Sequence, residues 1–208
     1  MLFFTRHHFK KLQQAIIDGD LTLLKKQFGK LDHASLQQER FSFQDMTLNA
    51  QELAIQAGQP KVLEHLLSAG LALESSTASP LLYQALRQQE QSLALLTVLL
   101  QAGAPFEYPE AETDYALLAC FKYCSEDKLM LHLSRLNEYG ADLNRADAEE
   151  NTALILALKS NQQALVQMLI NSGAALPENL AEGICSDELR QYAKRCSEDL
   201  RIRQMMLG

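Results

Sequence analysis

The stretch that decides the fold is Asn151–Ala174, which reads NTALILALKSNQQALVQMLINSGA. Thr152 can cap a helix because its hydroxyl accepts an unpaired backbone N–H of the first turn, and apolar residues follow it at helical spacing. The apolar pattern resumes at Leu165 and stops before Gly173, and glycine readily takes the left-handed conformation that closes a helix. The stretch therefore predicts two short helices, which need similar neighbours to bury their apolar faces.

Similar helix endings recur along the chain. A leucine-containing segment closes on a glycine at Gly70, Gly103, Gly140 and Gly173, and these glycines are separated by 33, 37 and 33 residues. A period near 33 residues is typical of a repeat architecture, in which each helical hairpin packs on the next.

On these residues the chain resembles the ankyrin-repeat family. Ser79, Pro80 and Leu81 match the Thr-Pro-Leu start of that family's repeat, and GADLN at 140–144 is close to its consensus ending. The resemblance implies an all-α fold, an ankyrin-type α-solenoid of about five stacked helix-turn-helix repeats with a C-terminal capping helix. We expect a single ankyrin-repeat domain over 1–208, with repeats at 9–33, 46–78, 79–112, 113–147 and 148–177 and the cap at 178–206.

Two features of the second expected repeat stand out. Asn49 and Glu52 have the spacing of a capping box, in which each side chain accepts from the other residue's backbone N–H. Gln51 stands where the family usually has a buried leucine, so we expect a looser junction at this point.

The third and fourth expected repeats depart from the regular length. Ala85 and Gly103 are 18 residues apart, against 15 for the equivalent Leu158 and Gly173. The three extra residues should lengthen the turn or a helix around residues 88–92. In the fourth repeat we expect Asp114 to cap the first helix.

The C-terminal segment predicts a longer amphipathic helix beginning at Ser186. A solenoid end needs one face on the last repeat and one in water, so we interpret this helix as a cap. A partner-binding helix and a helix that pairs between copies of the chain are the alternatives. The apolar face is predicted to comprise Leu189, Tyr192, Ala193, Cys196, Leu200 and Met205.

Composition and charge restrict the function classes. The chain has 208 residues, 47% of them hydrophobic, and no run near the roughly 20 apolar residues of a membrane span. The four cysteines form no Cys-x-x-Cys pair, so we expect free thiols and a cytoplasmic location, without membrane attachment. A formal charge of −7 argues against nucleic acid as a partner, and the basic residues gather at the two ends of the chain.

Signals for chemistry are missing from the sequence. The five histidines are scattered, no set of residues has metal-ligand spacing, and no nucleophile elbow or phosphate loop occurs. We therefore expect no enzyme activity, no cofactor and no metal. The alternative is a small-ligand or thiol-based catalytic protein, in which Cys120, Cys124 and His132 would form the reactive group.

The resemblance implies that the chain binds another protein through hairpin tips and the inner ends of first helices. We expect a monomer that recognises a partner with a basic surface. The predicted partner-binding residues are Tyr108, Glu110, Glu112, Phe121, Lys122, Arg145, Asp147, Glu149, Glu150 and Lys159.

Two of these positions have a second interpretation. The segment 105–114, PFEYPEAETD, carries four carboxylates around Tyr108, which suits a basic patch with one aromatic anchor. Tyr108 could instead lie on the neighbouring loop, with the carboxylates merely solvated. Phe121 could belong to the core, as an aromatic residue at helical spacing often does.

Overall fold

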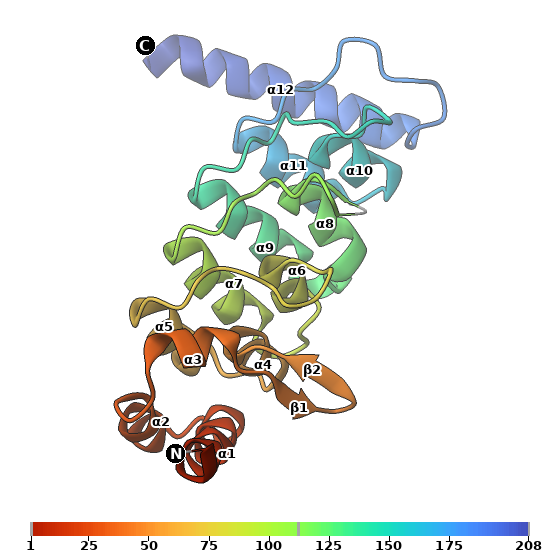
Figure 1. The fold of residues 1–208 in the computed structure, drawn as a ribbon. Helices are drawn as coiled ribbons and strands as arrows, with labels where there is room; N and C mark the ends of the chain where they lie inside the picture. The colour runs from red at the N-terminus through yellow and green to blue at the C-terminus, as the bar shows by residue number, and fades with distance from the viewer. Residues whose placement is uncertain (1, 112, 208) are drawn as a thin grey trace. The chain divides into compact units, whose positions relative to one another are not determined.

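A computed structural model describes residues 2–111 and 113–207 (Figure 1). The described chain is mostly helical, with twelve helices and one two-stranded sheet, and it divides into two compact units, Met1–Ala111 and Glu112–Gly208. The helical content agrees with the expected all-α class. The boundary between the units falls where the third and fourth repeats were expected to meet, and the prediction of one continuous domain stays a prediction.

The first unit contains three helical hairpins. Each first helix lies beside the next first helix, and the second helices do the same. The hairpins are α1 (Leu2–Asp18) with α2 (Leu21–Phe28), α4 (Ala50–Gln56) with α5 (Pro60–Ser68), and α6 (Leu81–Leu86) with α7 (Ser92–Gln101).

The segment between the first two hairpins folds on its own and adds the sheet. It forms α3 (His33–Gln38) and the antiparallel strands β1 (Phe41–Phe43) and β2 (Met46–Leu48). Gln44 and Asp45 both have positive φ, 48° and 63°, as a tight hairpin turn requires. The sheet is a departure from the expectation of helices alone.

The second unit contains two hairpins and a long terminal helix. Within it, α8 lies beside α10 and α12 packs on α11. The elements are α8 (Ala116–Tyr123) with α9 (Glu126–Glu138), α10 (Ala153–Lys159) with α11 (Gln163–Asn171), and α12 (Asp187–Leu207).

The predicted helix ends are largely confirmed. The Thr152 hydroxyl accepts from the backbone N–H of Ile155 at 3.3 Å. Asn49 and Glu52 form the complete capping box. The four repeated glycines all have left-handed backbones, with φ between 86° and 103°. The α6–α7 turn has two residues more than the α10–α11 turn, and α7 is one residue longer than α11, which accounts for the extra three.

Two local predictions are wrong. Tyr115, not Asp114, is the N-cap residue of α8, because Tyr115 is still extended (φ −131°, ψ 131°) and starts the helix one residue later. The junction at Gln51 is not loose, because Gln51 is 2% exposed and donates from its side chain to the Ala72 carbonyl at 2.6 Å.

The predicted apolar face of α12 holds only in its first half. Leu189, Ala193 and Cys196 are buried, whereas Met205 is 67% exposed because the last turns extend past the helix they would pack on. None of the helices that the structure describes is both long and apolar enough to span a membrane.

Candidate partner-binding surface

The predicted binding residues divide between the two units. Tyr108 and Glu110 belong to the first unit, and Glu112 lies outside the described residues. The other seven lie in the second unit, on α8, at the end of α10, and on the loop between α9 and α10. Within that unit the loop tip at 145–151 has the most defined geometry.

The tip is organised around the carboxylate of Asp147. It accepts hydrogen bonds from the backbone N–H groups of Glu149 (2.9 Å) and Asn151 (2.8 Å) and from the Asn151 side chain (3.0 Å). Burial raises the pKa of Asp147, but these bonds outweigh it and leave the pKa below its usual value. The Asp147 carboxylate is therefore used to shape the loop and is not free for a partner.

Asn151 and Lys159 connect the tip to helix α10. Asn151 is only 5% exposed, and its side-chain oxygen accepts from the Lys159 ammonium group at 2.5 Å. Lys159 is the last residue of α10, so the end of the helix is tied to the loop before its start. Two of the predicted binding residues thus act together to hold the tip.

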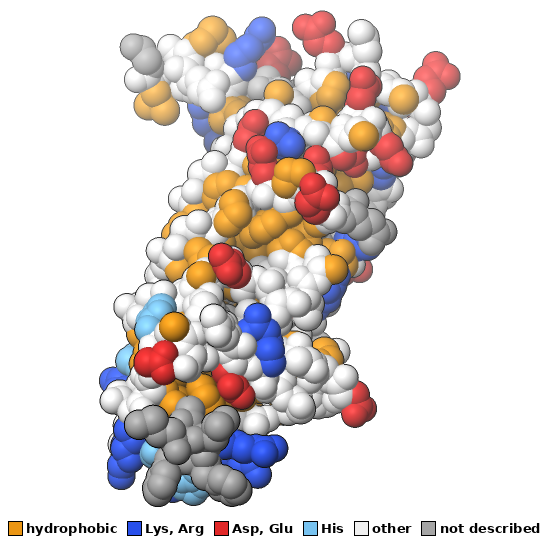
Figure 2. Space-filling view, viewed as in Figure 1, with side chains coloured by type: hydrophobic (Ala, Val, Ile, Leu, Met, Phe, Trp, Pro, Cys, Tyr) orange, Lys and Arg blue, Asp and Glu red, His pale blue; other side chains and the backbone are white. Residues whose placement is uncertain are grey.

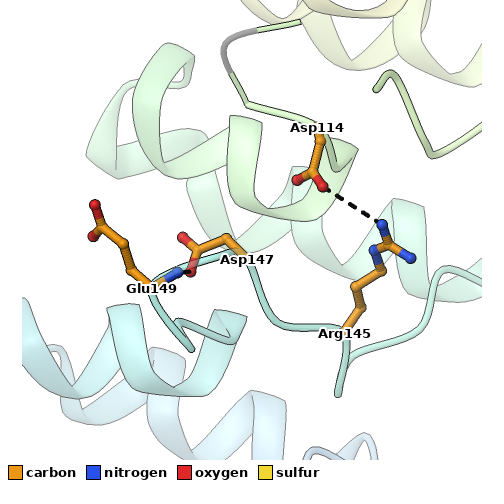
Figure 3. A network of polar contacts seen from close by, with 4 residues as sticks. All are labelled: Asp114, Arg145, Asp147 and Glu149. Atoms are coloured by element: carbon orange, nitrogen blue, oxygen red, sulfur yellow. Dashed lines mark hydrogen bonds and ion pairs between the residues drawn. The ribbon is translucent and has the colours of Figure 1, made fainter. Parts of the chain in front are cut away.

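Arg145 is engaged on the other side of the tip. Its guanidinium group lies 3.5 Å from the Asp114 carboxylate and 5.4 Å from the centroid of the Tyr115 ring (Figure 3). Asp114 therefore pairs with Arg145, where the sequence suggested a helix cap. An ion pair this exposed contributes at most about 1 kcal/mol.

Glu149 and Glu150 are the exposed carboxylates of the tip. Figure 3 shows the Glu149 side chain directed away from Arg145 and Asp114. Its carboxylate accepts from Asn151 at 3.3 Å, and Glu150 has a left-handed backbone with φ 61°. The two carboxylates stand in water on a loop whose backbone is fixed from below.

Phe121 and Lys122 lie in the last turn of α8. Phe121 is half-buried, which is intermediate between the two interpretations of its role. Lys122 is exposed, with its ammonium nitrogen 5.6 Å from the Tyr123 ring centroid.

In the first unit, Tyr108 packs in the way the second interpretation described. Its ring meets the ring of the buried Tyr83 edge to face, with centroids 4.9 Å apart, and burial raises the pKa of the Tyr108 phenol. Glu110 is exposed beside it. Tyr108 is therefore committed to packing and makes a poor anchor for a partner.

The residues of the catalytic alternative are buried or only partly accessible. Cys120 is fully buried, and burial raises the pKa of its thiol well above the usual value. His132 is 1% exposed, burial lowers its pKa, and its Nδ1 donates to the Lys128 carbonyl at 2.8 Å. Activation of a thiol needs a lowered pKa, so the Cys120 environment opposes it. In the part of the chain that the structure describes, no cluster of three or more His, Cys, Asp or Glu residues could hold a metal ion.

The most extensive polar cluster lies in the first unit and centres on Glu52. This carboxylate is fully buried and accepts hydrogen bonds from side chains or backbone groups of Asn49, Ser75, Ser76, Thr77 and Gln84. Burial raises its pKa, but the hydrogen bonds prevail and lower it to about 2. The capping-box spacing predicted only the bond to Asn49. The other donors lie 23 to 32 residues further along the chain, beyond the reach of a local pattern.

Comparisons with known proteins give no family for this chain. No model of a protein family matches it, and no curated protein matches it.

Proposed function

We propose that the chain is an ankyrin-type repeat protein that binds another protein and has no catalytic role of its own. The period of the left-handed glycines and the pairing of helices inside each unit support the ankyrin assignment. The binding role is supported by a preformed loop tip in the second unit.

The observation that carries the proposal is the tip at 145–151. Asp147 and Asn151 satisfy the loop's own backbone and side-chain groups, while Glu149 and Glu150 remain exposed. A loop fixed before binding loses little conformational entropy when a partner docks. Two exposed carboxylates favour a partner with a basic surface.

The resulting function is that of a scaffold, adaptor or inhibitor. Lys122 and Lys159 lie near the ends of the first helices of the second unit, next to the tip region in the ankyrin arrangement. The chain would work as a monomer in the cytoplasm, without a cofactor.

The test compares three versions of the full chain as bait for cell proteins. One is unchanged, one carries Glu149→Lys with Glu150→Lys, and the matched control carries Glu178→Lys with Glu182→Lys, two exposed carboxylates elsewhere in the same unit. All three should have the same thermal unfolding curve. We expect quantitative mass spectrometry to find a protein enriched on the unchanged and control baits and at least tenfold depleted on the tip variant.

Equal recovery of every captured protein on all three baits would exclude the tip as the binding surface. A partner lost from the control bait as strongly as from the tip variant would mean that net charge, and not the tip, drives capture.

A further inference from the structure

The acidic net charge of the chain conceals a basic end. Residues 1–31 contain six basic and two acidic residues, a formal charge of +4, whereas residues 32–208 contain thirteen basic and twenty-four acidic residues, a formal charge of −11. In Figure 2, Lys and Arg side chains lie on both sides of the end of the first unit that α1 and α2 form in Figure 1.

The acidic residues of this end are already in use. Asp18 accepts from the Gln14 side chain at 2.8 Å, and Asp20 caps α2 by accepting from the Leu23 backbone at 2.9 Å. Among the described residues, none of the six basic side chains forms an ion pair or a hydrogen bond. The exposed cations are Arg6, Lys10, Lys11, Lys25, Lys26 and Lys30.

Part of this charge borders a hollow between α2 and α5. The hollow has a volume of about 300 Å³ and is lined by Lys25 of α2 and by Lys61 and His65 of α5. Leu21 contributes an apolar wall, and the Phe28 ring braces His65 edge to face, with centroids 5.9 Å apart. Two exposed ammonium groups thus lie on opposite helices over a partly apolar floor.

A second hollow adjoins the first on the other side of α5. It has a volume of about 320 Å³, lies between α5 and α7, and shares Glu64 and Ser68 with the first. Leu67 and Val98 line it, and no basic residue does. The combined groove is basic toward α2 and apolar toward α7, and Glu64 stands on the ridge between the halves.

We infer that the α2–α5–α7 groove is a second binding surface, which takes an acidic peptide segment that carries an apolar residue next to its carboxylates. The carboxylates lie between Lys25 and Lys61, and the apolar residue lies against Leu67 and Val98. The net charge of +4 on residues 1–31 attracts such a segment from solution. This inference concerns the opposite charge and a different unit from the tip at 145–151, so it does not rest on the proposed function.

Peptide binding by the full chain tests the inference. The probe is a fluorescein-labelled peptide of Glu residues with one central Leu, followed by fluorescence anisotropy at low and moderate salt. We expect binding that weakens as salt rises, since the contacts are between exposed charges. The double change Lys25→Glu with Lys61→Glu should weaken binding at least tenfold.

The matched control is Lys194→Glu with Arg195→Glu, which changes the net charge equally at two exposed positions of α12. It should bind the probe within threefold of the unchanged chain. Should the Lys25 and Lys61 pair fail to fold with glutamates, Lys25→Ala with Lys61→Ala should still weaken binding at least threefold, and Val98→Asp should weaken it independently.

Two results would overturn the inference. One is equal loss of binding in the groove variant and the α12 control. The other is binding of phosphatidylserine vesicles or of a DNA duplex that is tighter than the peptide and lost with the same lysines, because the groove would then serve a membrane or a nucleic acid.

Discussion

The side-chain amide of Gln84 donates to the carboxylate of Glu52 at 3.1 Å, although the two residues are 32 positions apart. Glu52 lies on α4 and Gln84 on α6, so this buried bond joins two successive hairpins of the first unit. The loop at 75–77 closes over the same carboxylate.

Glu52→Gln should destabilise the first unit in a pH-dependent way. The folded-state pKa of about 2 lies below the ordinary 4.5, so the charged carboxylate contributes stability above pH 4.5 that is lost as the pH falls toward 2. A shift of this size corresponds to about 3 kcal/mol. Urea unfolding at pH 7 should therefore show a loss of that order for the variant, and the difference should shrink between pH 5 and pH 3. A loss that stays constant over that range would contradict the assignment of the charge to Glu52.

Leu169→Ala should cost about 2 to 5 kcal/mol of unfolding free energy, because Leu169 is fully buried on α11, between α10 and α12. Chemical denaturation measures the change, and the neighbouring exposed Gln167→Ala is the control, expected within half a kcal/mol. A loss below half a kcal/mol for Leu169→Ala would mean that this side chain does not fill the contact between those helices.

Asp147→Ala should loosen the tip at 145–151 while leaving both exposed carboxylates in place. Removal of the shared acceptor frees the backbone N–H groups of Glu149 and Asn151, so their hydrogen exchange should accelerate. Asp142→Ala removes one comparable bond, to the Asn144 backbone, and should leave the tip unchanged. Unaltered exchange at Glu149 and Asn151 would show that the carboxylate does not order the loop.

Thiol labelling of the native chain should proceed in two classes. Cys124 and Cys185 are half-buried and should react first, whereas Cys120 and Cys196 are buried and should react slowly, with Cys120 slowed further by its raised pKa. Peptide mapping after timed alkylation identifies the order, and all four should react alike in urea. Rapid modification of Cys120 in the native chain would revive the thiol-based alternative.

Local sequence predicts the helix ends of this chain well, because their determinants lie within a few residues. Thr152, the Asn49–Glu52 pair and Gly173 each act on the turn next to them. The β-hairpin was not predicted, because its turn residues Gln44 and Asp45 are not the Asn-Gly or Asp-Gly pair that usually signals one.

Side-chain roles that depend on distant partners were predicted less well. The Tyr108 ring could be assigned to packing or to binding until its contact with Tyr83 was known. Asp114 has the composition of a cap, but its partner is Arg145, 31 residues later. Buried polar positions such as Asn151 also depend on which loop groups the fold brings to them.

The Glu52 cluster also fixes the order of the hairpins around it. A duplicated hairpin inserted between α5 and α6 would move Gln84 away and leave an anion in the interior without its donors, at a cost of several kcal/mol. Gains and losses of repeat units during evolution should therefore avoid this joint and occur at joints held by apolar contacts alone.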